Sequence, residues 1–154
     1  MPSLLGNADY VSLFEPTASS TEIAGKGYIV ASIGKETAEL PYTAYFAKKS
    51  YIEDNPEIIQ KFTNAIYKGQ KWMTSHSTEE VASAIEQYFP NTEHSLIVTV
   101  LNRYADIDVW SSTPYLEEEG FDLLQTIIQD AGELKQKAPY DKIINNDFAN
   151  EAMK

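Results

Sequence analysis

Residues 6–16 read GNADYVSLFEP, and the predicted fold depends on this stretch. Val11 and Leu13 suit a pleated, largely buried strand. Glu15 and Pro16 suit the first turn of a helix, because proline has no N–H to lose there and a carboxylate favours the positive end of the helix dipole. Open α/β folds usually bind ligands where a strand end meets a helix N-terminus. The run therefore predicts a ligand site on an α/β scaffold.

The composition is that of one soluble globular domain, with 154 residues of which 43% are apolar and 23% charged. A net charge of −11 argues against nucleic acid and against docking on an anionic membrane. The absence of cysteine excludes disulfides, thiolate nucleophiles and cysteine metal sites. No apolar run reaches transmembrane length, and the N-terminus lacks the pattern of a signal peptide. Because the chain starts almost directly on the first strand, we expect a fragment of a longer protein.

The front of the chain predicts about three strands, at residues 8–14, 28–32 and 40–47. A short helix is expected over residues 16–24, ending near Gly25 and Gly27, and residues 34–39 form a polar connection. Pro41 restricts the third strand to an edge or a strand start.

The rest of the chain predicts helices. Asn55 caps a helix that starts at Pro56, and its apolar residues recur at helical spacing: Ile58, Ile59, Phe62, Ala65, Ile66, Gly69, Trp72 and Met73. Ser77 and Glu80 form a capping box, and Pro90 stops the helix that follows. Further helices are expected near residues 92–105, 114–131 and 146–152. Three strands form only a small sheet for this many helices to cover, and such a chain rarely makes a whole α/β domain by itself.

Four pieces of sequence carry a family resemblance, and their order spans nearly the whole chain. They are residues 6–16; residues 40–43 with residues 51–72; Arg103-Tyr104 with Trp110, Pro114 and residues 131–134; and residues 140–149. In this order the chain resembles the C-terminal half of the NMT1/ThiY-like substrate-binding proteins of ABC importers, which include sulfonate, taurine, nitrate and thiamine-pyrimidine binders.

The resemblance implies a type II periplasmic-binding-protein fold of α/β class, in which two lobes close on a small polar organic solute. Residues 1–40 would supply the end of the second lobe and the hinge segment. Residues 41–154 would supply a crossing strand and the helices that pack on the first lobe. Residues 32–42 are the hinge candidates, with an ordinary polar loop as the alternative. The implied partners are the solute and a membrane permease, and the implied location is extracytoplasmic, in a periplasm or on a lipid anchor.

The predicted ligand residues lie at the end of the first strand and in the crossing segment. They are Ser12, Phe14, Glu15, Thr17 and Tyr42. Glu15 either accepts hydrogen bonds from a ligand or only stabilises the helix start, and a ligand-facing carboxylate favours a nitrogenous ring over an anion. Tyr42 either stacks on a flat ligand or packs between lobes. Trp72 and Trp110 are expected to pack.

Catalysis has little support, and we expect no enzyme activity, no metal and no cofactor. His76 and His94 lack partners at the spacing of zinc sites. Two alternatives stay open: a thiamine-pyrimidine-synthase-like enzyme, and a helical protein-interaction module. A fragment with exposed apolar surface can also form a dimer or a swapped dimer.

Overall fold

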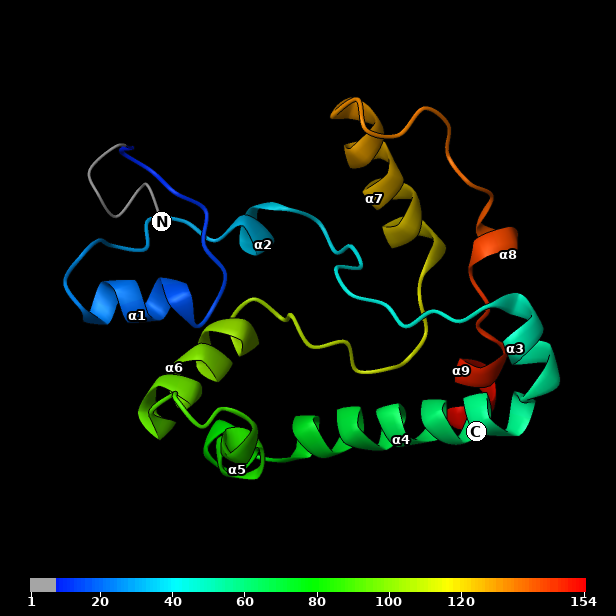
Figure 1. Ribbon diagram of the computed structural model, residues 1–154, viewed down its shortest axis with the longest axis horizontal. Helices are drawn as coiled ribbons and strands as arrows, with labels where there is room; N and C mark the ends of the chain where they lie inside the picture. The colour runs from blue at the N-terminus through cyan, green and yellow to red at the C-terminus, as the bar shows by residue number, and fades with distance from the viewer. Residues whose placement is uncertain (1–7) are drawn as a thin grey trace. The chain divides into compact units, whose positions relative to one another are not determined.

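The computed structural model describes residues 8–154, so Gly6 and Asn7 of the opening run lie outside the described residues (Figure 1). Nine α-helices and one 3₁₀ helix make up the regular structure of this described part. They are α1 (Thr17–Ile23), α2 (Ile33–Glu36), α3 (Lys49–Asp54), α4 (Pro56–Ser75), α5 (Thr78–Ile85), η2 (Glu86–Tyr88), α6 (His94–Ala105), α7 (Glu118–Asp130), α8 (Tyr140–Ile143) and α9 (Asp147–Ala152).

The predicted strands do not form: residues 8–154 contain helices and irregular segments but no strand. The α/β class, the three strands and the type II two-lobe arrangement are therefore wrong for this structure. A strand needs a neighbouring strand to pair its N–H and C=O groups, and residues 8–14, 28–32 and 40–47 have none here. Their apolar side chains stay largely exposed, Phe46 being 98% exposed. Part of the predicted polar connection is the short helix α2.

The chain divides into two compact units, each described here by itself. Unit 1 combines the described residues up to Glu36 with His76–Trp110, and unit 2 combines Thr37–Ser75 with Ser111–Lys154. The domain boundary after residue 40, which the family resemblance implies, concerns a larger protein and stays a prediction. In the described part, no helix is long and apolar enough to cross a membrane.

Unit 1 is built on the packing of α5 against α6 (Figure 1). The buried apolar side chains of this contact are Val81 and Ala82 from α5 and Ile97 and Leu101 from α6. The predicted capping box is confirmed, since the Ser77 hydroxyl accepts the Glu80 N–H while the Glu80 carboxylate accepts the Ser77 N–H. The shorter helix α1 also packs on α6.

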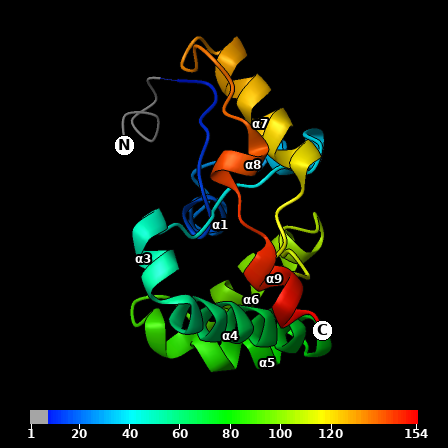
Figure 2. The same cartoon turned by 90° about the vertical axis from the view of Figure 1, so that its right-hand side faces the viewer.

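Unit 2 is built on the long helix α4, which begins at Pro56 as predicted. The C-terminal helix α9 lies against it, as both ribbon views show, and buries Ala149 (Figures 1 and 2). Helix α7 begins at Glu118, four residues later than predicted, and keeps the expected acidic residues in its first turn.

Two side-chain amides hold the irregular segments of unit 2. The Asn146 amide bonds both backbone groups of one residue: its Oδ1 accepts the Leu116 N–H at 3.1 Å and its Nδ2 donates to the Leu116 carbonyl at 3.0 Å. The buried Gln125 amide makes the same pair of hydrogen bonds to Ala138. Its Oε1 accepts the Ala138 N–H at 2.6 Å, and its Nε2 donates to the Ala138 carbonyl at 3.2 Å. These amides satisfy backbone groups that a strand partner would otherwise satisfy.

Replacing Ser77 by alanine tests the start of α5. Because the substitution removes the hydroxyl that accepts the Glu80 N–H, we expect the free energy of unfolding to fall by about 1 kcal/mol. Glu80→Gln is the matched control, since glutamine keeps an oxygen that can accept the Ser77 N–H. Urea unfolding measures both variants, and an S77A protein as stable as the wild type would contradict the assignment.

The pH dependence of unit 1 tests a second contact of α5 and α6. His94 lies 2.6 Å from the Glu86 carboxylate and 2.9 Å from that of Glu79, and these hydrogen bonds raise the pKa of the imidazole above 6.5. Since the pKa of His94 is raised in the folded state, the stabilisation that the protonated His94 contributes is complete below the unfolded pKa of about 6.5. This stabilisation is lost as the pH rises through the folded-state pKa. NMR titration should find the raised pKa, and Glu79→Gln with Glu86→Gln should return it to near 6.5. An unchanged value in the double variant would refute the contact.

Candidate functional site

The carboxylate of Glu15 caps the first turn of α1. Its Oε2 accepts the Ser19 N–H at 3.0 Å and its Oε1 accepts the Ser19 hydroxyl at 2.9 Å. Pro16 stands one position before the helix, and Gly25, with φ of 66°, ends it as predicted. The Lys26 N–H reaches back to the Thr21 carbonyl at 3.0 Å, which completes a Schellman ending. The sequence thus fixes both ends of α1.

Arg103, in the last turn of α6, joins α1 to α6. Its Nη1 donates to the Ser19 hydroxyl at 2.7 Å and lies 3.4 Å from Glu15 Oε1, while its Nη2 donates to the Glu22 carboxylate. Ser19 is fully buried and the Glu15 side chain is only 10% exposed. We call these four residues, Glu15, Ser19, Glu22 and Arg103, the Arg103 cluster.

The charges of the Arg103 cluster stabilise one another. The Ile29 N–H, which donates to Glu22 at 3.0 Å, and the Arg103 guanidinium hold the pKa of Glu22 below 4.5. Glu22 and Glu15 together raise the pKa of Arg103, so the guanidinium stays charged. Glu15 therefore already has a cation and a hydroxyl as partners. These contacts agree with the alternative in which Glu15 stabilises the start of the helix.

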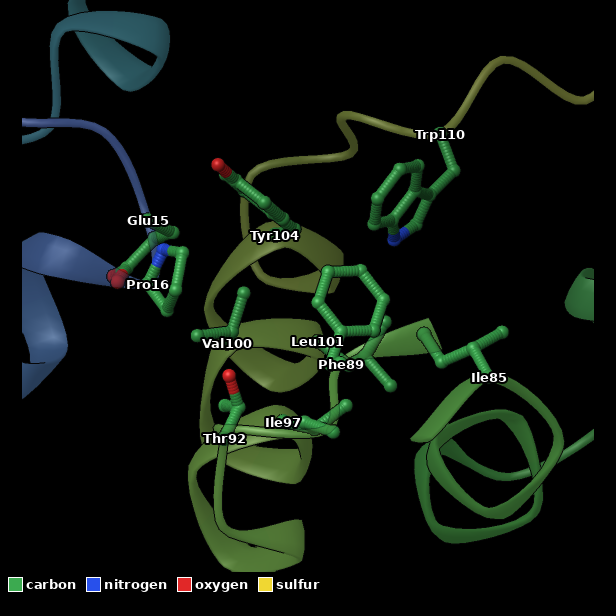
Figure 3. Close-up of a pocket in the computed structure, with 10 residues that line it drawn as sticks. All are labelled: Glu15, Pro16, Ile85, Phe89, Thr92, Ile97, Val100, Leu101, Tyr104 and Trp110. Carbon is green, nitrogen blue, oxygen red and sulfur yellow. The ribbon is translucent and has the colours of Figure 1, made fainter. Parts of the chain in front are cut away.

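Beside the Arg103 cluster lies a cavity of about 190 Å³ within unit 1. Figure 3 shows the side chains around it, which come from the start of α1, the end of α5 and the segment after it, α6, and the segment after α6. Most of them are aliphatic or aromatic. The lining residues are Glu15, Pro16, Ile85, Phe89, Thr92, Ile97, Val100, Leu101, Tyr104 and Trp110.

Aromatic rings form one side of the cavity. The rings of Tyr104 and Trp110 meet edge to face, with centroids 5.4 Å apart and planes at 86°. In Figure 3 the oxygens of Glu15 lie on the far side of Pro16 from Trp110, so the carboxylate turns away from these rings. The cavity is therefore apolar, with the Thr92 hydroxyl and the Trp110 N–H as polar groups of its lining residues.

The predicted ligand residues are not all gathered at this cavity. Glu15 lines it, whereas Ser12 and Phe14 are exposed on the preceding segment and Thr17 is half-buried at the start of α1. Tyr42 is exposed and belongs to unit 2. Their ligand roles stay predictions.

Sequence reasoning missed the other half of the site, which comes from α6 and its flanks. The sequence placed Arg103 and Tyr104 only in a piece of the family resemblance, and it predicted packing for Trp110. One face of α6 carries apolar residues at helical spacing: Ile97, Val100, Leu101 and Tyr104. Such a pattern predicts an apolar helix face, but it does not reveal a cavity. Trp110 packs edge to face on Tyr104 but stays 38% exposed, so it is not the buried core residue that the sequence predicted. Among residues 8–154 no group of three histidines, aspartates or glutamates is arranged to hold a metal.

Comparison with known proteins gives one informative similarity. The chain is 42% identical over 146 residues to a Bacillus subtilis (strain 168) protein named "Putative binding protein YtlA". The match covers 95% of this chain and 44% of that relative, so the chain spans less than half the relative's length. No protein-family model matches the chain, and no solved structure matches it. The chain is thus similar to part of a protein named for binding, not for catalysis.

Acid unfolding tests the Arg103 cluster. Because the pKa of Glu22 is lowered in the folded state, its stabilisation is complete above about 4.5 and is lost as the pH falls through the lowered value. Glu22→Gln keeps an acceptor for the Ile29 N–H but removes the charge, so we expect a flatter loss of stability below pH 4.5. Thermal melts at a series of pH values below 4.5 would detect this difference. Melting temperatures that fall equally with pH in the variant and the wild type would contradict the ion pair of Glu22 with Arg103.

Proposed function

We propose that this chain is the ligand-binding part of an extracytoplasmic solute-binding protein of an ABC importer, related to the ThiY-like proteins that its sequence resembles. Two observations support the proposal: the similarity to a protein named for binding, and the apolar cavity beside the Arg103 cluster. The cavity carries the argument. Its lining combines hydrophobic and aromatic side chains with a few polar groups, as small-molecule sites do.

The size of the cavity limits the ligand. An apolar cavity of about 150 Å³ can hold benzene, so about 190 Å³ leaves room for one ring with small substituents. The edge-to-face pair of Tyr104 and Trp110 offers ring surfaces to a flat molecule. An indole N–H such as that of Trp110 can donate to a ring nitrogen or a carbonyl oxygen.

Charge favours a neutral or weakly basic ring over an anion. A sulfonate, taurine or nitrate would bring a negative charge into an apolar cavity, and Arg103 is already engaged by Glu15 and Glu22. Burying an unpaired charge is unfavourable. A thiamine-type pyrimidine therefore leads the candidate solutes, ahead of sulfonates, taurine and nitrate.

The proposed role is capture without a chemical step, followed by delivery to a membrane permease. An enzyme related to thiamine-pyrimidine synthesis gains no support from any observed side-chain arrangement. A helical interaction module is the alternative that one observation favours, because Ile58 and Phe62 of α4 are 54% and 44% exposed.

Isothermal titration with the thiamine pyrimidine, taurine and nitrate tests the proposal. We expect the pyrimidine to bind and Trp110→Ala to weaken it about 10-fold, the equivalent of one lost aromatic contact. Trp72→Ala is the matched control, because it removes the chain's other tryptophan from unit 2.

Two results would contradict the proposal. One is a folded protein that binds none of the three solutes. The other is equal weakening by W110A and W72A, which would place the solute away from the cavity.

A further inference from the structure

The Thr92 hydroxyl is a polar group at the cavity of unit 1 that the fold does not engage. Thr92 stands between η2 and α6, lines the cavity and is half-buried. Helix α6 begins after Glu93 without a side-chain cap, so the Thr92 hydroxyl does not hold the helix start. Within the described part of the chain, this hydroxyl has no hydrogen-bond partner. It is therefore available to a ligand in the cavity.

The backbone around Thr92 fixes this hydroxyl at the cavity. The Thr92 N–H donates to the Phe89 carbonyl at 2.9 Å, which closes a turn with one cavity residue at each end. The Glu93 carbonyl then accepts the Ile97 N–H at 3.2 Å and begins α6. In Figure 3 the Thr92 oxygen points toward Val100, another lining residue. A hydroxyl held between a turn and a helix is preorganised to bind a ligand.

A second polar group, the Trp110 N–H, comes to the cavity from the segment after α6. In Figure 3 the indole nitrogen lies at the end of the ring nearest Phe89. An indole N–H can only donate, whereas a threonine hydroxyl can both donate and accept. The side chains of Ile97, Val100 and Leu101 offer no hydrogen bond at all.

A half-buried hydroxyl without a partner discriminates between ligands. A ligand with a polar group beside this hydroxyl keeps a hydrogen bond that it would otherwise lose on leaving water. A ligand with a methyl group in the same place leaves the hydroxyl unpaired, and sites of this kind reject such analogues. The cavity of about 190 Å³ admits one ring with small substituents. A substituent is thus the part of the ligand that Thr92 can recognise.

We propose that Thr92 determines the specificity of the cavity through a hydrogen bond between its hydroxyl and a hydroxyl or amino substituent of the bound ring. The ligand class is a neutral aromatic ring that carries such a substituent. This inference rests on the proposed capture of a small ring by the cavity. It does not depend on which ring is the natural solute, so simple one-ring compounds can test it.

Binding of benzyl alcohol and toluene tests this hydrogen bond, because the two compounds differ by one hydroxyl group. NMR titration of the whole chain gives the dissociation constants for the wild type and for Thr92→Val and Thr92→Ser. Valine has nearly the shape of threonine but no hydroxyl, so T92V should weaken benzyl alcohol about 5-fold and should not weaken toluene. T92S keeps the hydroxyl, so it should bind benzyl alcohol more tightly than T92V does.

Thr99→Val is the matched control. The Thr99 hydroxyl donates to the Ser95 carbonyl of the same helix at 2.9 Å, and Thr99 does not line the cavity. T99V therefore removes a hydroxyl from α6 without changing the cavity, and both dissociation constants should stay as in the wild type.

Three results would overturn the assignment of Thr92. The first is a T92V protein that binds benzyl alcohol as tightly as the wild type. The second is equal weakening of benzyl alcohol and toluene by T92V, because Thr92 would then act through its shape alone. The third is an effect of T92S or T99V as large as that of T92V.

The same titrations separate this assignment from the proposed cargo. Binding of benzyl alcohol that depends on Thr92, together with no binding of the thiamine pyrimidine, would contradict the cargo and support the role of Thr92. A folded wild-type chain that binds neither benzyl alcohol nor toluene would contradict both, since the cavity would then take no ring.

Discussion

The fork of the Arg103 guanidinium is the contact on which unit 1 depends. One of its nitrogens meets Glu15 and Ser19 and the other meets Glu22, so the whole length of α1 is tied to the last turn of α6. A planar, permanently charged group suits this task, since lysine would offer one point charge in place of two directed donors. The same contact brings Glu15 and Pro16 against α6 and so forms one wall of the cavity. The ion pairs and the cavity are parts of one arrangement.

Unit 2 meets a different constraint, which is that its irregular segments have no strand partners. Asn146 and Gln125 each bond the N–H and the carbonyl of a single residue, Leu116 and Ala138. The Tyr140 hydroxyl adds a further hydrogen bond to the Leu116 carbonyl, and its burial there raises the pKa of the phenol. These side chains thus satisfy the hydrogen-bonding groups of single backbone residues, as a β-ladder would satisfy those of a longer segment.

Local signals predicted the helices well because capping and periodicity act within a few residues. Pro56 starts α4, Ser77 caps α5 and Gly25 ends α1, each by a contact with its own neighbours. The strands were predicted wrongly because apolar alternation reports a preference for a pleated, buried surface, and such a surface needs distant partners. For the site, Glu15 was found from its place before a helix. Arg103 is 88 residues away in sequence, and no local pattern could have paired the two.

We propose that a small flat solute enters the cavity of unit 1, and the indole of Trp110 offers a direct probe of it. The chain has two tryptophans, Trp72 in unit 2 and Trp110 at the cavity, so two indole N–H signals are expected in a nitrogen–proton NMR spectrum. Adding the thiamine pyrimidine should shift the Trp110 signal in a saturable way and leave the Trp72 signal in place. A saturable shift of Trp72 alone, or of neither signal, would contradict it.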